Sequence, residues 1–438
     1  MVCSRLWCRS YEASGGEGIA PFAGSLNPVM EHPVRKPKLH KSQQHKTRRG
    51  PSQQRRPNDL SRSLAALDPD RTLIAVIEMS ASSWLVAGLV PGVERQPLKK
   101  LEPDEHALLA LLERWRREAV RSGYAATRIA VAYEAGRDGF WLARWLQANG
   151  IEAHVIHAAS VAVSREHRRA KTDRLDAELL KRAFLGWLRG ERDHCKMVAI
   201  PTVDEEDARR PGRERESLVG EATRIVNRVK SALARIGIRA FNPKLKQAVD
   251  KLDGLRSPEG HPIPPHTRDE MKRDLERRQL ICEQIHQIEQ DRLQRLEQTP
   301  TAGTTTMLRL LARVIGVGIE TADTLVREIL TRNLRDRRAV ARYGGLTGAP
   351  QQSGNLDREK GLARSGNARV RKCMVELAWR FVRWQKDSEL AKWFEARTAQ
   401  ARGTRKTMIV ALARKLLIAL WRLVHDGVVP EGVVMRPA

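Results

Sequence analysis

From Thr72 to Leu188 the chain alternates apolar runs with segments of helical periodicity, and this order limits its possible folds. Apolar, β-branched runs predict buried strands at residues 72–77, 84–90, 128–133 and 151–156, with a further strand at 93–98. Helical spacing predicts helices at 108–120, 137–148 and from Asp173 to Leu188. Three strands followed by helix, strand, helix, strand and helix predict a mixed α/β sheet covered on both faces.

Four acidic residues occupy equivalent places in this pattern. Glu78 ends the first strand, Glu134 ends the fourth, and Asp173 and Asp176 begin the last helix, where Thr172 or Asp173 is the expected cap. Each acid alone is also explained as a solvated carboxylate, or as a first-turn acid that the helix dipole favours. Four converging carboxylates would repel one another without cations. Two Mg²⁺ ions about 3.5–4 Å apart would relieve that repulsion and hold both oxygens of a phosphodiester displacement.

The charge of the chain favours a nucleic-acid partner. Seventy-nine Lys and Arg against 52 Asp and Glu leave a formal charge of +27. We expect no membrane association, because the most apolar stretch, 408–424, is interrupted by Arg414, Lys415 and Arg422. The first thirty residues lack an apolar signal segment, and the five cysteines form no disulfide or zinc spacing. A reducing cytoplasm, with association to the nucleoid, is therefore expected.

Composition divides the chain into four parts. Residues 1–70 are expected to be a disordered basic arm, or a dispensable tail upstream of Met30, because nine Lys or Arg and no acid lie between Val34 and Pro57. Residues 71–238 form the expected catalytic domain, and 239–300 a connector and a coiled-coil-like helix. This helix either joins protomers or packs on its own domain. Residues 301–438 are expected to be mostly helical.

The segment 308–330 predicts two helices around a Gly-Val-Gly turn. It is similar to a helix-hairpin-helix, in which Gly316 and Gly318 would let backbone amides approach a phosphate. The alternative is an ordinary helical turn that needs glycine for a positive φ.

Ser353 lies in a segment rich in glycine, proline and serine that precedes a helix with a buried face. A serine before glycine is most often only a turn former. Here many basic residues follow it, and these would stabilise a pentavalent phosphate. With no histidine nearby to act as base, the acidic residues of the first domain are the expected activator.

Two motifs carry a resemblance to a known family. Residues 133–139 (YEAGRDG) and 168–177 (RRAKTDRLDA) resemble the RuvC-like, RNase H-fold domain of DEDD-type insertion-sequence transposases, family one-hundred-and-ten. These are serine-dependent recombinases guided by a bridge RNA. Residues 345–371 are similar to the family's C-terminal transposase domain. Glu78 departs from the usual aspartate, and its extra methylene moves the carboxylate by about 1.5 Å.

The resemblance implies a transposase that cuts and rejoins strands of an insertion sequence. Glu78, Glu134, Asp173 and Asp176 would hold Mg²⁺, and Ser353 would form a covalent link to a 5′- or 3′-phosphate. Donor and target DNA, a bridge RNA and a homodimer or tetramer are the implied partners, with Ser353 acting on a neighbouring protomer's carboxylates in a composite site. The expected nucleic-acid contacts are Arg165, Arg168, Arg169, Lys171, Gly316, Gly318, Arg364, Asn367, Arg369 and Arg371.

Two other classes of protein remain open from the residues. A RuvC-like, structure-selective endonuclease would cleave with metal-activated water and would not use Ser353. An inactive nucleic-acid-binding relative would retain the charge without the chemistry, with Glu78 marking the loss of activity.

Overall fold

The computed structural model describes residues 60–136, 139–161, 172–300, 302–353, 356–363, 365–399 and 404–437. Nearly all of the expected basic arm, residues 1–59, therefore lies outside the described residues. The first folded part is a six-stranded mixed sheet in the order β3-β2-β1-β4-β5-β6. Its strands are β1 (Thr72–Met79), β2 (Trp84–Leu89), β3 (Leu98–Leu101), β4 (Arg128–Glu134), β5 (Glu152–Ile156) and β6 (Met197–Val198). Strands β1, β4 and β5 are parallel, and the remaining pairings are antiparallel.

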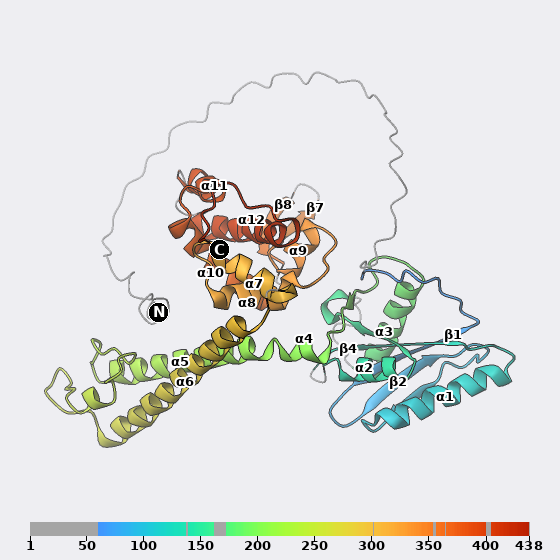
Figure 1. The fold of residues 1–438 in the computed structure, drawn as a ribbon. Helices are drawn as coiled ribbons and strands as arrows, with labels where there is room; N and C mark the ends of the chain where they lie inside the picture. The colour runs from blue at the N-terminus through green and yellow to red at the C-terminus, as the bar shows by residue number, and fades with distance from the viewer. Residues whose placement is uncertain are drawn as a thin grey trace, which may run out of the picture. The chain divides into compact units, whose positions relative to one another are not determined.

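Both faces of the sheet are covered, as the apolar runs predict. On β1, Leu73, Ala75 and Ile77 share one core with α1 (Glu105–Arg121) and α2 (Trp141–Ala148). The alternate residues Ile74 and Val76 share a second core with α3 (Asp173–Leu188) on the opposite face (Figure 1). A strand buried on both faces is continuously apolar, which is why this part of the fold can be recognised from the sequence.

Three local predictions for this domain need correction. The strand expected at 93–98 lies at Leu98–Leu101 instead, because its Leu-Lys-Lys-Leu residues form a mostly exposed edge and carry no apolar alternation. The helix expected from residue 137 begins at Trp141. The two-residue strand β6 was not expected, since a strand of this length has no periodicity.

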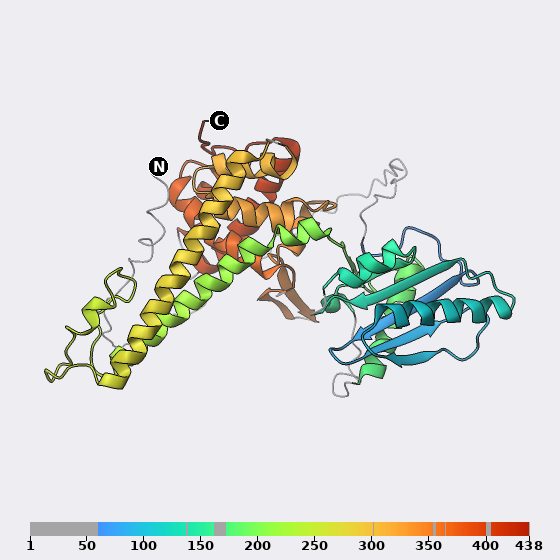
Figure 2. The ribbon, with the colours of Figure 1, turned by 60° about the horizontal axis from the view of Figure 1, so that its bottom comes forward.

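Two long helices form an arm after the sheet domain. The short α4 (Val203–Asp207) leads into α5 (Arg210–Arg235), and α6 (Pro265–Gln298) runs back beside α5 (Figures 1 and 2). Ile225, Val229 and Leu275 lie in the core that the two helices share with their connector. The coiled-coil-like helix expected within residues 239–300 is α6, and it packs against α5 of its own chain.

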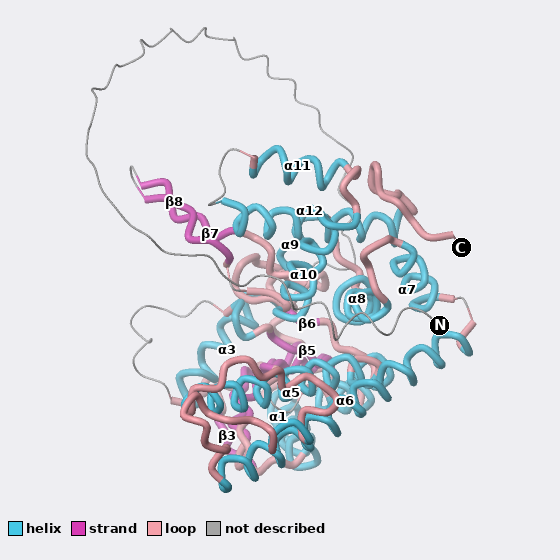
Figure 3. The backbone as a smooth tube through the Cα atoms, turned by 90° about the vertical axis from the view of Figure 1, so that its left-hand side faces the viewer, coloured by secondary structure: helices cyan, strands magenta, loops and turns pink. Residues whose placement is uncertain are grey.

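The last part is a helical cluster with one β-hairpin. Its core surrounds α12, whose Leu412, Leu416 and Leu420 are fully buried. Figure 3 shows the hairpin β7–β8 extending from the helices; the Gly-, Pro- and Ser-rich composition there gave no indication of strands. The elements are α7 (Gly303–Arg313), α8 (Ile319–Leu325), the π-helical turn η4 (Val326–Leu330), α9 (Arg337–Tyr343), β7 (Gly348–Ser353), β8 (Leu356–Leu362), α10 (Ala368–Trp384), α11 (Glu389–Thr398) and α12 (Arg405–Asp426).

None of the helices in the described part of the chain is long and apolar enough to span a membrane.

Candidate active site

Glu134 is the last residue of β4, and Glu78 is the penultimate residue of the neighbouring parallel strand β1, which continues one residue beyond the end that the sequence predicts. Strands β1 and β4 pair in a register that sets Ile77 opposite Tyr133, so the residues that follow each of these, Glu78 and Glu134, lie side by side at the carboxyl ends of the strands. Both glutamates are half-buried. This edge of a parallel arrangement is where open α/β folds bind ligands.

The first turn of α3 carries the two aspartates. Thr172 is the N-cap: its Oγ1 accepts a hydrogen bond of 3.3 Å from the Leu175 amide. This resolves the choice between Thr172 and Asp173 as cap. Asp173 is exposed and Asp176 is half-buried, one helical turn apart, and α3 packs against β1 and β2.

The four acids suit a hard divalent cation by chemistry, since carboxylate oxygens are the ligands that Mg²⁺ prefers. Their geometry is only partly assembled. Among the described residues, which include all four, no group of three or more His, Cys, Asp or Glu could hold one metal ion. The strand register brings Glu78 and Glu134 together, and Asp173 and Asp176 lie in the first turn of α3.

Ser353 is the last residue of β7, where it pairs with Leu356 at the start of β8. Residues 354 and 355, between them, lie outside the described residues. Gln352 and Ser353, which the sequence predicts to lie in a turn, instead form the end of strand β7. Cys195 and Cys373 are poor alternatives as nucleophiles, because burial raises the pKa of each thiol to about 12.

Two glycines allow the chain to pass close to itself at the base of this hairpin. Gly345 has φ +65° and Gly366 has φ +88°. A Cβ on Gly366 would stand 2.4 Å from the Arg342 carbonyl oxygen and 2.7 Å from the Gly345 nitrogen. The Asn367 amide also donates to the Tyr343 carbonyl at 2.7 Å. The Tyr-Gly-Gly and Ser-Gly-Asn segments therefore fasten the two ends of the hairpin together.

Asn367 joins the hairpin base to a buried carboxylate. Its Oδ1 caps α10 by accepting from the amides of Arg369 and Val370, while its Nδ2 donates to Glu328 at 3.0 Å. Arg213 of α5 donates to the same carboxylate at 3.0 Å. Burial alone would raise the pKa of Glu328, but the hydrogen bonds from Arg213 and Asn367 lower it below its usual value.

The ion-pair network around Glu328 was not predicted from the sequence. Arg215 of α5 pairs with Glu289 and Glu320, and Arg292 of α6 pairs with Glu320 and Asp323. Arg209, the buried N-cap residue of α5, donates to the Arg327 carbonyl. The sequence shows only that several arginines lie close together around the start of α5, and it does not show which acidic residues they pair with.

Eight of the ten expected nucleic-acid contacts divide into two groups. Arg165, Arg168, Arg169, Lys171 and Arg364 lie outside the described residues. The side chain of Asn367 is engaged within the protein, as described above. Arg369 pairs with Glu216 at 3.0 Å, and Arg371 donates to the Ser365 carbonyl at 3.4 Å. In this structure these three residues support the hairpin base.

The turn between α7 and α8 contains Gly316, whose φ of +95° alone explains a glycine at this position. Two amides of this turn are engaged internally: Ile315 donates to the Val434 carbonyl, and Val317 to the Val314 carbonyl. The first turn of α8 carries Glu320, an acid where a phosphate-binding helix would offer only amides. The element order matches a helix-hairpin-helix, but these contacts also suit an ordinary packed turn.

Comparison with known proteins places these elements in a family. Residues 94–238 match a family of transposases with a DEDD domain, and residues 308–392 match the transposase family IS116/IS110/IS902. The first match contains Glu134, Asp173 and Asp176 but begins after Glu78; the second contains Ser353.

Two relatives that match over most of their own length point the same way. The Sinorhizobium fredii protein named "Putative transposase y4rJ" is 40% identical over 371 residues, which cover 82% of this chain and 93% of that protein. The transposase for insertion sequence element IS1328 of Yersinia enterocolitica is 24% identical over 302 residues, or 68% of this chain and 84% of that protein. The chain belongs to the IS116/IS110/IS902 family of transposases, enzymes of DNA strand transfer.

Proposed function

We propose that this transposase cuts and rejoins DNA with a carboxylate site on the sheet domain and a serine nucleophile on the β7–β8 hairpin. Glu78, Glu134, Asp173 and Asp176 would hold Mg²⁺, in two ions when complete. The parallel register that sets Glu78 beside Glu134 is the observation that carries this proposal. Bound Mg²⁺ would supply charge neutralisation at the scissile phosphate and its leaving oxygen.

Ser353 is proposed to attack the scissile phosphorus through its Oγ. The bond from Oγ to phosphorus forms as the bond from phosphorus to the leaving sugar oxygen breaks, and the serine proton passes to a base or to solvent. The DNA strand is then held on the protein as a phosphoserine until a second sugar hydroxyl displaces Oγ. In support, Ser353 ends a strand whose base is fixed by Gly345, Gly366 and Asn367. A rigid base would position a nucleophile accurately.

The test is a denaturing gel of end-labelled donor DNA incubated with the full-length protein, Mg²⁺ and RNA transcribed from the element's flanks. A slow-migrating, protease-sensitive adduct is expected with the wild type and not with Ser353→Ala. Ser365→Ala, a serine at the hairpin base, is the matched control and should keep the adduct. Free cleaved DNA with both the wild type and Ser353→Ala, and no adduct with either protein, would assign cleavage to metal-activated water, as in a structure-selective endonuclease. No cleavage by any of them would favour an inactive nucleic-acid-binding relative.

A bridge RNA and a homodimer or tetramer are proposed as partners. The large positive charge suits RNA as well as DNA, and delegating sequence choice to base pairing leaves the protein to contact the backbone. Oligomerisation would allow Ser353 of one protomer to act at a neighbour's carboxylates. Sedimentation of the protein alone, with the RNA, and with the RNA after nuclease treatment tests both partners: it measures the oligomeric state and whether the RNA is bound.

The functional division that we propose is a catalytic domain at 71–238, the connector and helical arm at 239–300, and the serine-bearing helical domain at 301–438. Arg165, Arg168, Arg169, Lys171 and Arg364 are proposed to contact nucleic acid directly. Gly316 and Gly318 are proposed to approach a phosphate in a helix-hairpin-helix.

A further inference from the structure

Two tryptophans lie at the surface where α10, α11 and α12 meet. Helix α11 packs on α12 at the outside of the C-terminal cluster, with α10 also in contact with α12 (Figures 1 and 3). Trp379 of α10 is 40% exposed, although its ring centre is 6.2 Å from that of the fully buried Phe394 of α11. Trp393, the residue before Phe394, is half-buried. Two large aromatic side chains held partly in water around one helix indicate a binding surface.

Each of these tryptophans has a cation against its ring. The guanidinium carbon of Arg405, on α12, lies 5.8 Å from the ring centre of Trp379. Lys415 Nζ, also on α12, lies 4.7 Å from the ring centre of Trp393, and the guanidinium carbon of Arg397, one turn further along α11, lies 5.9 Å from it. These five residues form the tryptophan face. A ring attracts a cation but offers no oxygen to its N–H donors.

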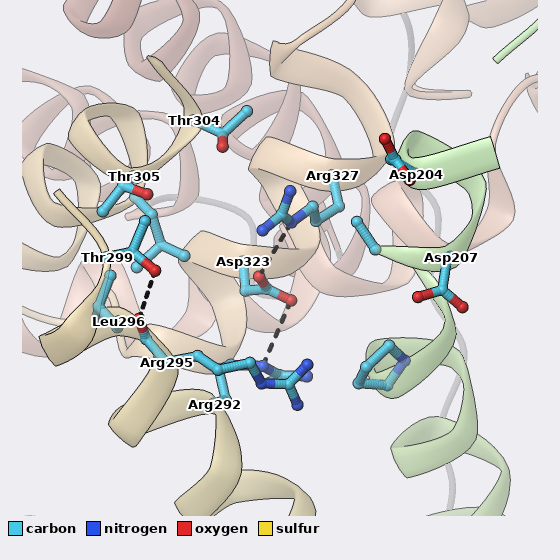
Figure 4. Close-up of a pocket in the computed structure, with 13 residues that line it drawn as sticks. Asp204, Asp207, Arg292, Arg295, Leu296, Thr299, Thr304, Thr305, Asp323 and Arg327 are labelled. Carbon is cyan, nitrogen blue, oxygen red and sulfur yellow. Dashed lines mark hydrogen bonds and ion pairs between the residues drawn. The ribbon is translucent and has the colours of Figure 1, made fainter. Parts of the chain in front are cut away.

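The cations of the tryptophan face differ from the arginines of the helical arm. In the arm, Arg292 and Arg327 both pair with the carboxylate of Asp323 (Figure 4). Within the described part of the chain, no carboxylate lies at ion-pair distance from any of the three cations of the face, and all three are exposed. Helix α12 carries five basic residues, and its single acid, Asp426, is its last residue. The donors of this face are therefore open to an anionic partner.

The pairing of rings with cations selects among anionic partners. Free phosphate or an acidic peptide would use the cations alone, and the bases of a duplex hide their faces against one another. Unpaired nucleotides offer a phosphate together with an open aromatic face, and every base can stack on tryptophan. A guanidinium can contact a ring through its plane while its edge donates to a phosphate. Arg405 and Lys415 are ten residues apart, about 15 Å along α12, so the face extends beyond one nucleotide.

We propose that the tryptophan face binds unpaired nucleotides, with Trp379 and Trp393 stacking on bases and the three cations contacting phosphates. The proposal rests on the DNA substrate of a transposase, and it is independent of the serine mechanism and of the helix-hairpin-helix. Single-stranded DNA and a single-stranded part of an RNA share this chemistry, and the test distinguishes them.

The test measures binding of fluorescent oligonucleotides of about 12 nucleotides to the full-length protein in EDTA, by anisotropy between about 50 and 200 mM salt. Trp379→Leu should weaken binding of an unpaired strand roughly tenfold, leave the slope of log K against log salt unchanged, and leave duplex binding unchanged. Arg405→Gln with Lys415→Gln should lower that slope by about 1.4, since each single-strand phosphate contact contributes about 0.7.

Two variants serve as controls. Trp141→Leu is matched in exposure, because Trp141 is 38% exposed, and its ring lies on the sheet domain beside Trp84. Lys272→Gln with Arg273→Gln, both exposed on α6, is matched in charge. Both controls should bind the unpaired strand as the wild type does. Equal losses in a control and in the corresponding face variant would overturn the site.

The oligonucleotides are made of deoxythymidine and of uridine to separate the two sources. A loss confined to the deoxythymidine strand in Trp379→Leu would assign the face to DNA, and a loss confined to the uridine strand would assign it to RNA. Equal weakening of single-stranded and duplex binding would show that the ring does not stack on a base, and would overturn the proposal.

A second measurement uses the wild type alone and so does not depend on whether Trp379→Leu folds. Single strands that carry 5-iodouracil are irradiated on the protein, and the cross-linked peptides are identified by mass spectrometry. Cross-links at Trp379 or Trp393 are expected, and cross-links confined to other segments would contradict the proposal. Because neither measurement involves cleavage, failure of the serine mechanism would leave these results unaffected.

Discussion

Asn367 Nδ2 donates a 3.0 Å hydrogen bond to Glu328 Oε2, connecting the start of α10 to a carboxylate that is 5% exposed. Arg213 reaches the same carboxylate from α5. The base of the Ser353 hairpin is therefore fastened to the helical arm through one buried anion. Glu328 lies in a π-helical turn, an irregularity that is frequent at functional sites.

Replacing Asn367 should cost more than losing a helix cap. Asn367→Ala removes both the cap of α10 and a donor to a buried anion, so we expect unfolding free energy to fall by about 2–3 kcal/mol. Asp336→Ala, which removes the cap of α9, is the control and should cost about 1 kcal/mol. Urea unfolding at neutral pH measures both. Equal losses would show that the Glu328 contact contributes nothing.

Neutralising a proposed metal ligand should abolish cleavage without unfolding the protein. Glu134→Gln and Asp176→Asn each remove an anionic oxygen, and we expect Mg²⁺-dependent cleavage to fall by more than about 100-fold. Glu118→Gln, which removes only a surface ion pair with Arg114, should retain activity. Circular dichroism should be unchanged in all three. Full activity in either site variant would remove that residue from the metal site.

Glu78 can be tested by side-chain length. Glu78→Asp keeps the charge and moves the carboxylate by only about 1.5 Å. If Glu78 is a metal ligand, this variant should therefore retain cleavage within about tenfold. Glu78→Gln keeps the shape without the charge and should be inactive. Cleavage rates measured at saturating Mg²⁺ distinguish the two variants. Equal activity of both variants would mean that cleavage does not depend on a negative charge at this position.

Burial explains which parts of the fold could be predicted from the sequence. Strands β1 and β4 are apolar throughout because both faces are covered, whereas β3 is an exposed edge and was misplaced. The hairpin β7–β8 was missed because its pairing depends on close backbone contacts at Gly345 and Gly366, which composition does not reveal.

The candidate site could also be predicted only in part from the sequence. The positions of Glu78 and Glu134 at strand ends follow from the sequence pattern, but their adjacency depends on the parallel register of β1 and β4. Asn367 was expected to contact nucleic acid, and its bond to Glu328 spans 39 residues, a separation that no local pattern reports. The catalytic roles of the four acids and of Ser353 stay predictions.

The two turn glycines should respond differently to alanine. At Gly316, with φ +95° and Trp384 at 3.6 Å, alanine forces a strained backbone, and we expect a loss of about 1–2 kcal/mol in unfolding free energy. At Gly318 nothing lies within 4 Å of an added Cβ, so stability should be unchanged. DNA affinity of Gly318→Ala then tests the helix-hairpin-helix. Weaker DNA binding by this stable variant is expected if a phosphate approaches there, and unchanged binding would favour an ordinary turn.

An ion pair between neighbouring strands should make stability depend on pH. Glu152 of β5 accepts hydrogen bonds from Arg128 Nε at 2.6 Å and Arg128 Nη2 at 2.9 Å, and lies 2.7 Å from His154 Nε2. Burial would raise the pKa of Glu152, but hydrogen bonds from His154 and Arg128 outweigh it and lower this pKa to about 2, against an ordinary value of 4.5. A depressed pKa means that the folded state prefers the ionised carboxylate. The stabilisation is therefore complete above about pH 4.5 and is lost as the pH falls toward 2.

Glu152→Gln removes this contribution. We expect the variant to be less stable than the wild type by a constant amount from about pH 7 down to pH 5, with the difference shrinking at lower pH because the wild type loses the same interaction. Urea unfolding at about pH 7 and pH 4 measures this difference in unfolding free energy. The surface variant Glu118→Gln should differ little from the wild type at either pH. A gap that widened on acidification would contradict the assignment, because it would require Glu152 to stabilise the fold in its protonated form.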